Sequence, residues 1–361
     1  MKAIVLVGGE ATRLRPLTYN TPKAMVPVLN IPFLEYVIRH LGEHQVNDIV
    51  LALGHLSQPI KDYLGDGRRF GVSLYYSIED TPLGSAGAAK YAERYLNESF
   101  LVLNGDIFAE LDFTAMINLH RERKAKATIA VTPVDNPTSY GLVETNDHGR
   151  VTRFLEKPKP EEVTTNMINA GAWLVESDIL DLIPPRTQFS FERNVFPQIL
   201  AQKEPVYAYP ISGYWMDMGT PEKYLQLNRD LLGGKSSHYI PSQSNEIVTG
   251  KQCEIHPTAQ IKGPVVIGAN CSVGRQVKLI GPVVIGDRCT IQDDSLIEDS
   301  VIWRSVRLGT QVQIKKSIVA DNCVLSDDSF IEESVLGENV TVGSGYHVLP
   351  DSKIEPGNII E

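Results

Sequence analysis

Two different spacings of apolar residues divide the chain. Over residues 1–135, short apolar runs alternate with segments whose apolar residues recur at helical spacing. The runs predict strands at Ala3–Val7, Asp48–Leu53, Val72–Ser77, Phe100–Asn104 and Ala127–Val131. The helical segments are Gln58–Leu64, Ser85–Tyr95 and Phe113–Arg123, with a further helix that opens at Pro32. This alternation predicts an α/β domain whose parallel sheet is covered by helices and binds ligands at the carboxyl ends of its strands.

From Tyr140 onward the pattern changes. Ser139–Val143 and Val151–Leu155 predict a strand pair joined through the turn Asn146–Gly149. Antiparallel additions of this kind often cover the mouth of an active site, so the sheet becomes mixed while remaining mainly parallel. A last helix is expected to begin at Pro221, with Thr220 as its cap.

The second spacing is a strict repeat of six. Apolar residues recur at every sixth position from Ile255 to Ile297, and the pattern continues to Ile360 after losing one residue at three places. Glycine often follows the apolar residue directly. A fixed hexapeptide repeat is typical of a left-handed parallel β-helix, in which three hexads make one triangular coil of 18 residues, or of 17 where one is lost. Ser300, Ser317 and Ser334 mark the equivalent shortened corner.

The repeat also accounts for the cysteines, Cys253, Cys271, Cys289 and Cys323, which fall in one column of the coils. They occupy the small inward-facing position two residues before the apolar one. We therefore expect buried thiols in a reducing compartment, and neither disulfide bridges nor zinc ligands.

Composition narrows the class of protein. The chain has 361 residues, 42% hydrophobic and 22% charged, with a formal net charge of −10. Two domains are expected at this length: 1–232, a polar linker at 233–248, and the repeat at 249–361. The acidic balance argues against a nucleic-acid partner. We expect no membrane span and no signal peptide, and therefore a cytoplasmic protein.

The first predicted strand ends in a loop suited to a phosphate chain. Gly8 and Gly9 allow backbone N–H groups to approach an anion, and Thr12, Arg13 and Lys23 follow with no acidic residue between Ala11 and Lys23. The loop is neither a P-loop nor a dinucleotide-binding GxGxxG.

Asp106 directly follows another buried strand and its Gly105. Its carboxylate should face the same rim as Gly8 and Gly9, where a phosphate substrate would need a divalent cation. From position alone, Asp106 could equally cap the next segment.

The first loop reads LxGGxxTRLRPLT followed by PKxMVPV, which resembles the signature of the sugar-phosphate nucleotidyltransferases. With the β-helix included, both halves of the chain resemble the mannose-1-phosphate guanylyltransferases of that family, which implies a Rossmann-like nucleotidyltransferase domain. One departure is Ala11, where the family usually has glycine. Alanine is tolerated there if φ is negative and harmful if the turn needs a positive φ.

The resemblance implies a role for each matching residue. Asp106 and Asp217 would bind Mg²⁺, Arg13 and Lys23 would hold the phosphates of the NTP, and Lys157 would hold the phosphate of the sugar. The further substrate-binding positions that it implies are Leu6, Gly8, Gly9, Thr12, Gly84, Gly141, Glu156, Asn169 and Gly171, of which Gly84 lines the base, and Glu156, Asn169 and Gly171 the sugar.

The implied reaction is direct displacement by a sugar 1-phosphate on the α-phosphate of an NTP, giving NDP-sugar and pyrophosphate. GTP with mannose 1-phosphate is favoured, and glucose 1-phosphate with dTTP or UTP is the alternative. A catalytically silent, nucleotide-sugar-binding regulatory subunit is a second class of function, which Ala11 permits. Acyl transfer by the β-helix is disfavoured, and we expect that module to support a homo-oligomer.

Overall fold

The computed structural model describes residues 1–9, 11–54, 56–236 and 247–361. Two compact units are present: Met1–Gly9 with Leu34–Met216, and Glu10–Phe33 with Asp217–Glu361. The greater part of the expected linker 233–248 lies outside the described residues. Helix α6 (Pro221–Leu232) ends directly before it, and strand β14 (Ile247–Thr249) begins within its last two residues.

The first unit is built on a mixed sheet. Its strands lie in the order β10 (Val151–Glu156), β9 (Gly141–Thr145), β11 (Met167–Val175), β6 (Phe100–Asn104), β1 (Lys2–Val7), β4 (Asp48–Leu53) and β5 (Ser73–Ile78). The four strands β6, β1, β4 and β5 are parallel, as the alternation predicts. They place their carboxyl ends at one edge of the sheet.

The fifth predicted strand does not extend the parallel set. β8 (Ala127–Pro133) pairs antiparallel with β11, which also pairs antiparallel with β6. On its other side β8 pairs in parallel with β12 (Val206–Pro210). Apolar runs show that a strand is buried but not which strand lies beside it, so this order was not available from the pattern.

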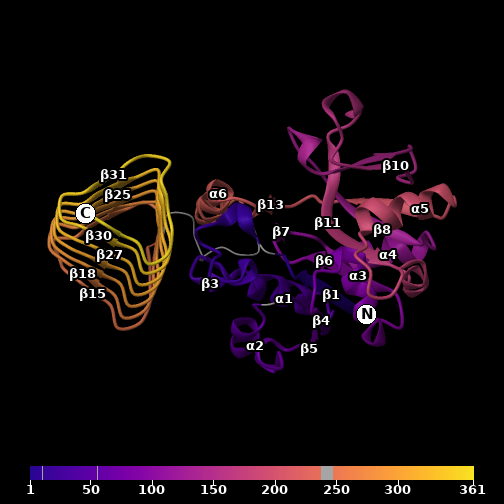
Figure 1. Ribbon diagram of the computed structural model, residues 1–361, viewed down its shortest axis with the longest axis horizontal. Helices are drawn as coiled ribbons and strands as arrows, with labels where there is room; N and C mark the ends of the chain where they lie inside the picture. The colour runs from indigo at the N-terminus through magenta and orange to yellow at the C-terminus, as the bar shows by residue number, and fades with distance from the viewer. Residues whose placement is uncertain (10, 55, 237–246) are drawn as a thin grey trace. The chain divides into compact units, whose positions relative to one another are not determined.

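Helices cover this sheet (Figure 1). They are α1 (Phe33–Glu43), α2 (Gln58–Leu64), α3 (Gly84–Tyr91), α4 (Phe113–Glu122) and α5 (Phe196–Ala201). Two short strands, β7 (Ile107–Ala109) and β13 (Trp215–Asp217), form a separate sheet. The core of this unit includes Phe100, Trp173, Phe191 and Phe196, all fully buried. The helix predicted to open at Pro32 begins one residue later, because Pro32 pairs with Pro27 in the hairpin of β2 (Pro27–Val28) and β3 (Ile31–Pro32).

The repeat of the second unit forms a left-handed parallel β-helix with three sheets (Figure 1). The first sheet contains β14, β17 (Val265–Ile267), β20 (Val283–Ile285), β23 (Val301–Ile302), β26 (Ile318–Val319), β29 (Val335–Leu336) and β32 (Lys353–Ile354). The second contains β15 (Glu254–Ile255), β18 (Ser272–Val273), β21 (Thr290–Ile291), β24 (Arg307–Leu308), β27 (Val324–Leu325), β30 (Thr341–Val342) and β33 (Ile359–Ile360). The third contains β16 (Gln260–Lys262), β19 (Lys278–Ile280), β22 (Leu296–Glu298), β25 (Gln313–Lys315), β28 (Phe330–Glu332) and β31 (His347–Val348).

The strand register confirms both coil lengths. Val265 pairs with Val283, a full coil further on, whereas Val284 pairs with Val301, which is a coil one residue shorter. At the shortened corner the hydroxyl of buried Ser317 donates to the Lys315 carbonyl at 2.6 Å and accepts from the Ser334 N–H at 3.1 Å. This ladder satisfies polar groups that the coil would otherwise bury without partners.

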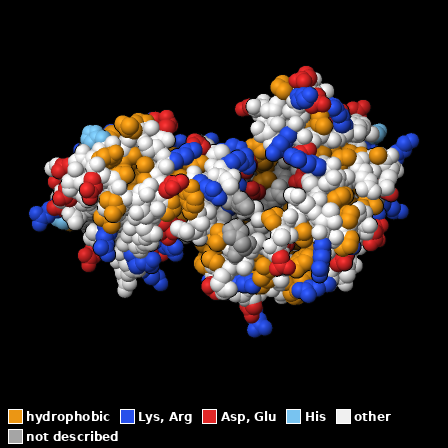
Figure 2. All heavy atoms as spheres, viewed as in Figure 1, with side chains coloured by type: hydrophobic (Ala, Val, Ile, Leu, Met, Phe, Trp, Pro, Cys, Tyr) orange, Lys and Arg blue, Asp and Glu red, His pale blue; other side chains and the backbone are white. Residues whose placement is uncertain are grey.

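The cysteine column lies inside the coils. Cys271, Cys289 and Cys323 are buried, Cys253 near the first coil is partly exposed, and all four thiols are free. Burial and the neighbouring carboxylates raise the pKa of Cys323 to about 12. Acidic and basic side chains are interspersed on the outside of the coils (Figure 2). Within the described ranges, no helix combines the length and the apolar character that crossing a bilayer requires.

Candidate active site

Three glycines meet at the carboxyl edge of the parallel strands in the first unit. A Cβ atom on Gly54, after β4, would lie 3.1 Å from the Gly8 carbonyl oxygen after β1. One on Gly105, after β6, would lie 2.8 Å from the Leu6 oxygen. The backbones therefore approach closely, and Asp106 follows at the same edge as Gly8, as expected from the sequence.

Asn169 and Gly171 form a bulge in β11. The register of β11 against β8 shifts between Asn169 and Trp173, and Asn169 Oδ1 accepts from the Gly171 N–H at 3.0 Å and from Trp173 Nε1 at 2.7 Å. Gly171 has φ 77°, and a Cβ there would lie 2.2 Å from Ile107 Cδ1. The bulge thus needs both residue types, and Nδ2 is the atom of Asn169 that can donate to a ligand.

The strand pair β9–β10 positions Glu156 and Lys157. Gly141 pairs with Glu156, and a Cβ on Gly141 would lie 3.0 Å from Glu156 Oε2. Burial and then the charge of Glu192 raise the pKa of Glu156, while Lys157 opposes the shift. The exposed Lys157 has a left-handed backbone, with φ 53°. Left-handed non-glycine residues are strained and concentrate at functional sites.

Two aromatic rings connect this strand pair with the bulge. The Tyr140 and Trp215 rings pack edge to face, with centroids 5.6 Å apart. Trp215 Nε1 donates to the Ala170 carbonyl oxygen at 3.1 Å. Lys157 N–H also donates to the Tyr140 carbonyl at 2.9 Å, so these contacts link the two expected sugar-binding segments.

The start of helix α3 packs against the segment before α5. Gly84 has φ 73°, and a Cβ there would lie 2.7 Å from the Phe189 carbonyl oxygen, which accepts the Gly87 N–H at 3.0 Å. Ser85 Oγ donates to Glu192 Oε2 at 2.7 Å. Glu192 therefore contacts the start of this helix and also acts through its charge on Glu156. No sequence motif predicts this connection.

In the second unit, Asp217 and Arg13 lie against the same glycine. A Cβ on Gly219 would lie 3.0 Å from Asp217 Oδ2 and 3.4 Å from Arg13 Nη2, so a side chain at this position would press on the Asp217 carboxylate and lie in contact with Arg13. The Asp217 carboxylate is buried and forms an ion pair with Lys223 Nζ at 3.2 Å. Lys223 stands in the first turn of α6, which Thr220 caps as predicted. The sequence analysis did not identify Lys223 as a functional residue.

The loop that carries Arg13 and Lys23 has two short 3₁₀ turns, at Thr12–Leu14 and Lys23–Met25. Ala11 precedes the first turn with φ 49° and ψ 37°. Its carbonyl oxygen accepts the Leu14 N–H at 3.1 Å and the Thr18 hydroxyl at 2.9 Å. Of the two cases considered for alanine, the structure shows the unfavourable one, with a positive φ.

The expected site residues thus fall into two sets. The first unit contains Leu6, Gly8, Gly9, Gly84, Asp106, Gly141, Glu156, Lys157, Asn169 and Gly171. The second contains Thr12, Arg13, Lys23 and Asp217. Within each set, residues distant in sequence lie close together, around Gly105, Gly141 and Gly171 in the first and beside Gly219 in the second.

Comparison with known proteins defines the class. The family model described as nucleotidyl transferase matches residues 2–234, and the chain belongs to this family. It is therefore a nucleotidyltransferase. A second model, described as the EIF2B subunit epsilon LbH domain, matches residues 244–348.

Several curated proteins are similar over much of the chain. A UTP–glucose-1-phosphate uridylyltransferase of Synechocystis is 34% identical over 86% of this chain and 84% of its own. A mannose-1-phosphate guanylyltransferase of Mycobacterium tuberculosis is 36% identical over 64% of this chain and 65% of its own. The mannose-1-phosphate guanyltransferase of Yarrowia lipolytica is 37% identical over 72% and 73%.

Two solved structures are similar to part of the chain. A putative glucose-1-phosphate thymidylyltransferase from Bacillus anthracis has TM-score 0.58 and 25% identity, and covers 63% of this chain and 94% of its own. HddC from Yersinia pseudotuberculosis, complexed with GMP-PN, has TM-score 0.54 and 28% identity over 63% and 97%.

Proposed function

We propose that this chain transfers the nucleotidyl group of GTP to mannose 1-phosphate, giving GDP-mannose and pyrophosphate. The observation that carries the proposal is the glycine-lined edge of the parallel strands, where Asp106 stands beside the end of β1 in a chain of the nucleotidyl transferase family. Two of the similar proteins named above are guanylyl transferases for mannose 1-phosphate. Glucose 1-phosphate with UTP or dTTP is the alternative, supported by the Synechocystis and Bacillus anthracis proteins.

In the proposed reaction an oxygen of the sugar phosphate attacks the α-phosphorus. One P–O bond forms, the bond to the β-phosphate breaks, and pyrophosphate leaves with its electron pair. Arg13 and Lys23 would hold the NTP phosphates, Lys157 the sugar phosphate, and Glu156 with the Asn169 amide the sugar hydroxyls. Such transfers need positioning and charge stabilisation, and no protein nucleophile.

The carboxylates of Asp106 and Asp217 fit Mg²⁺, because they are hard oxygen donors and Asp217 already holds a cation, the Lys223 ammonium, at 3.2 Å. Among the described residues no group of three or more metal-ligating side chains occurs, so phosphate and water oxygens would complete the coordination. When bound, the ion would neutralise charge on the phosphates.

We also propose a cytoplasmic location, domain boundaries at 1–232 and 249–361, and self-association through the β-helix. The ends of the two family matches, at residues 234 and 244, support the boundaries. The exposed apolar side chains Leu349 and Ile359 near the last coil support association with a second copy.

The test is pyrophosphate release with Mg²⁺, using GTP, UTP, dTTP, ATP and CTP against mannose 1-phosphate and glucose 1-phosphate. We expect GTP with mannose 1-phosphate to dominate. Asp106→Asn should lower turnover by about a hundredfold or more while keeping the melting temperature, since it removes one electrostatic stabiliser. Asp147→Asn, in an exposed turn, is the matched control.

Dominance of UTP or dTTP with glucose 1-phosphate would overturn the substrate assignment and keep the reaction. Nucleotide-sugar binding without turnover in any combination would favour the regulatory subunit. Normal Mg²⁺-dependent turnover of Asp106→Asn would reject the metal assignment.

A further inference from the structure

Trp303 breaks the pattern of one corner of the β-helix. The residues that follow the in-register apolar positions of neighbouring coils are small: Gly268, Gly286, Ala320 and Gly337. The column is tightly stacked, because a Cβ on Gly286 would lie 2.6 Å from the Trp303 carbonyl carbon. The Trp303 side chain is only 2% exposed although it occupies a corner of the coil. Something outside the coil must therefore cover it.

The covering group is Tyr224 of helix α6. The two rings pack at right angles, and Trp303 Nε1 donates to the Tyr224 hydroxyl at 2.9 Å. That hydroxyl donates in turn to the Pro27 carbonyl oxygen at 2.5 Å. Tyr224 is fully buried. A buried relay thus runs from the β-helix through α6 to the loop that carries Lys23.

The loop is attached to the same corner on both sides of Lys23. Before it, Thr21 Oγ1 donates to Glu338 Oε1 at 2.6 Å. After it, Asn30 Nδ2 donates to the Ile285 carbonyl oxygen at 2.7 Å. Lys23 itself stands in a turn closed by the Val26 N–H, which donates to the Lys23 carbonyl at 3.2 Å, directly before Pro27.

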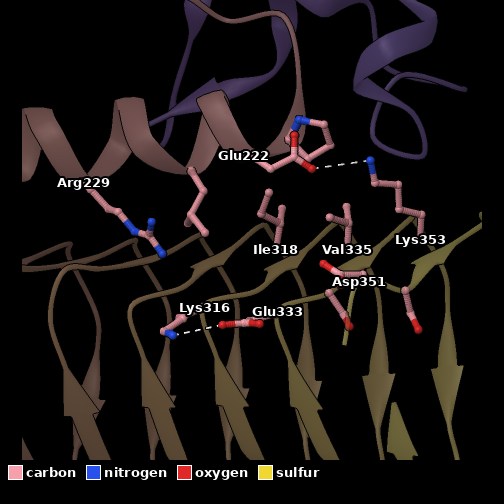
Figure 3. Close-up of a pocket in the computed structure, with 12 residues that line it drawn as sticks. Glu222, Arg229, Lys316, Ile318, Glu333, Val335, Asp351 and Lys353 are labelled. Carbon is pink, nitrogen blue, oxygen red and sulfur yellow. Dashed lines mark hydrogen bonds and ion pairs between the residues drawn. The ribbon is translucent and has the colours of Figure 1, made fainter. Parts of the chain in front are cut away.

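Among the described residues, α6 also meets the coils through ion pairs. Arg229 pairs with both oxygens of Asp299, at 2.6 and 2.8 Å, and Lys353 reaches Glu222 at 3.5 Å. Between these pairs a cavity of about 430 Å³ separates the helix from Ile318 and Val335 (Figure 3). The Lys353–Glu222 pair is exposed and screened by water, so it fixes the helix less firmly than the buried, hydrogen-bonded pair of rings does.

We propose that Trp303 is a positioning residue for the nucleotide, acting through Tyr224 on the turn that carries Lys23. The inference rests on the proposed binding of NTP phosphates by Lys23. The β-helix then contributes to the active centre and is more than a module for assembly. Without the indole N–H, the Tyr224 hydroxyl loses one partner, and both α6 and the turn become more mobile. NTP binding must then order them, which weakens the affinity.

The experiment compares Trp303→Phe and Tyr224→Phe with the wild type in the full chain. Both variants keep an aromatic ring in the packed space. Tyr224→Phe removes only the hydroxyl, whereas Trp303→Phe removes the indole N–H together with part of the buried ring. We expect the equilibrium dissociation constant for GTP to rise by about three- to tenfold, the effect of one or two lost hydrogen bonds. The KM for the sugar 1-phosphate should stay within about twofold, as expected for independent sites.

Ser317→Ala is the matched control. It removes a buried hydrogen-bonding side chain from the neighbouring coil of the same β-helix and is not a member of the relay. If the relay only stabilises the fold, all three variants lower the melting temperature and leave GTP affinity unchanged, which would overturn the inference. If it positions the nucleotide, Ser317→Ala loses stability alone, and the Trp303→Phe/Tyr224→Phe double variant binds GTP about as weakly as the worse single variant.

Direct GTP titration separates the two proposals. If the wild-type chain binds GTP but releases no pyrophosphate, the proposed reaction is contradicted. The relay is then still tested by comparing the GTP dissociation constants of Trp303→Phe and the wild type. A wild-type chain that turns over normally while Trp303→Phe binds GTP equally well contradicts the relay alone.

Discussion

Two non-glycine residues of the proposed phosphate-binding segments have left-handed backbones. Ala11 has φ 49° and Lys157 has φ 53°. The sequence identifies Ala11 as the departure from the family pattern, but the sign of φ is a property of the folded turn and had to come from the structure. Such strain is maintained only where the surroundings determine the conformation. At Ala11 they do so through the hydrogen bonds that Leu14 and Thr18 donate to its carbonyl oxygen.

Ala11→Gly should therefore stabilise the protein. The left-handed conformation costs alanine about 1–2 kcal/mol, and glycine gives back about 0.5–1 kcal/mol through its greater freedom when unfolded, so the net gain is below about 1.5 kcal/mol. Urea unfolding should show a higher midpoint for Ala11→Gly and a lower one for Ala11→Val, whose branched side chain tolerates positive φ poorly. Equal midpoints for all three proteins would show that the turn is unstrained.

Glu156 is expected to act on stability in a pH-dependent way. Burial and the nearby Glu192 raise its pKa in the folded state, so the folded chain holds this proton more tightly than the unfolded chain does. Below the ordinary carboxyl pKa both states are protonated and the effect vanishes. As the pH rises through that value the unfolded state ionises first and stability falls, until the folded carboxyl has ionised too.

Glu156→Gln should accordingly melt higher than wild type at pH 7 and equally at pH 3.5. The gain should be small, about 1–2 °C, because water screens a half-exposed carboxylate. The same variant should bind the sugar 1-phosphate more weakly, a trade of binding for stability that is common at active sites. Glu161→Gln, in an exposed turn, should show no such pH-dependent difference. If Glu156→Gln melted lower than the wild type at pH 7, the buried carboxylate would be stabilising there, which contradicts this prediction.

At the scale of elements, the sequence predicts a helix or strand well where the signal is local, such as a repeating apolar spacing or a helix cap. Asp48–Leu53, Gln58–Leu64 and Phe100–Asn104 have the predicted bounds, and Thr220 caps α6 because its side chain and Pro221 suffice to start a helix. The hexapeptide period predicts the coils, their two lengths and the column of cysteines.

Pairings between distant elements could not be predicted in the same way. The position of β11 between β6 and β8, the ion pair of Lys223 with Asp217, and the contact of Glu192 with Ser85 depend on where folded elements meet. Trp303 is an intermediate case. The break in its column is visible in the sequence, as a large aromatic where neighbouring coils have glycine or alanine, but its partner is visible only in the structure.

At the scale of the whole molecule, the second unit joins segments that the sequence separates. Residues from the first loop, helix α6 and the β-helix belong to one compact unit. In the matching structure from Bacillus anthracis, 94% of the solved chain is aligned with 63% of this one. In this chain, Tyr224 and Thr21, which precedes the turn around Lys23, form hydrogen bonds with Trp303 and Glu338 of the coils.

A chain shortened to end at Ser236 should therefore bind GTP at least about tenfold more weakly than the full chain, because it loses the Trp303 relay together with the attachments of Thr21 and Asn30 to the coils. It should also be less stable, since exposing a ring as large as that of Tyr224 costs about 2 kcal/mol. GTP titration and thermal unfolding of both chains measure the two effects. A shortened chain that melts like the full one and binds GTP as tightly would mean that the loop and α6 hold their positions unaided, and that the β-helix contributes only to assembly.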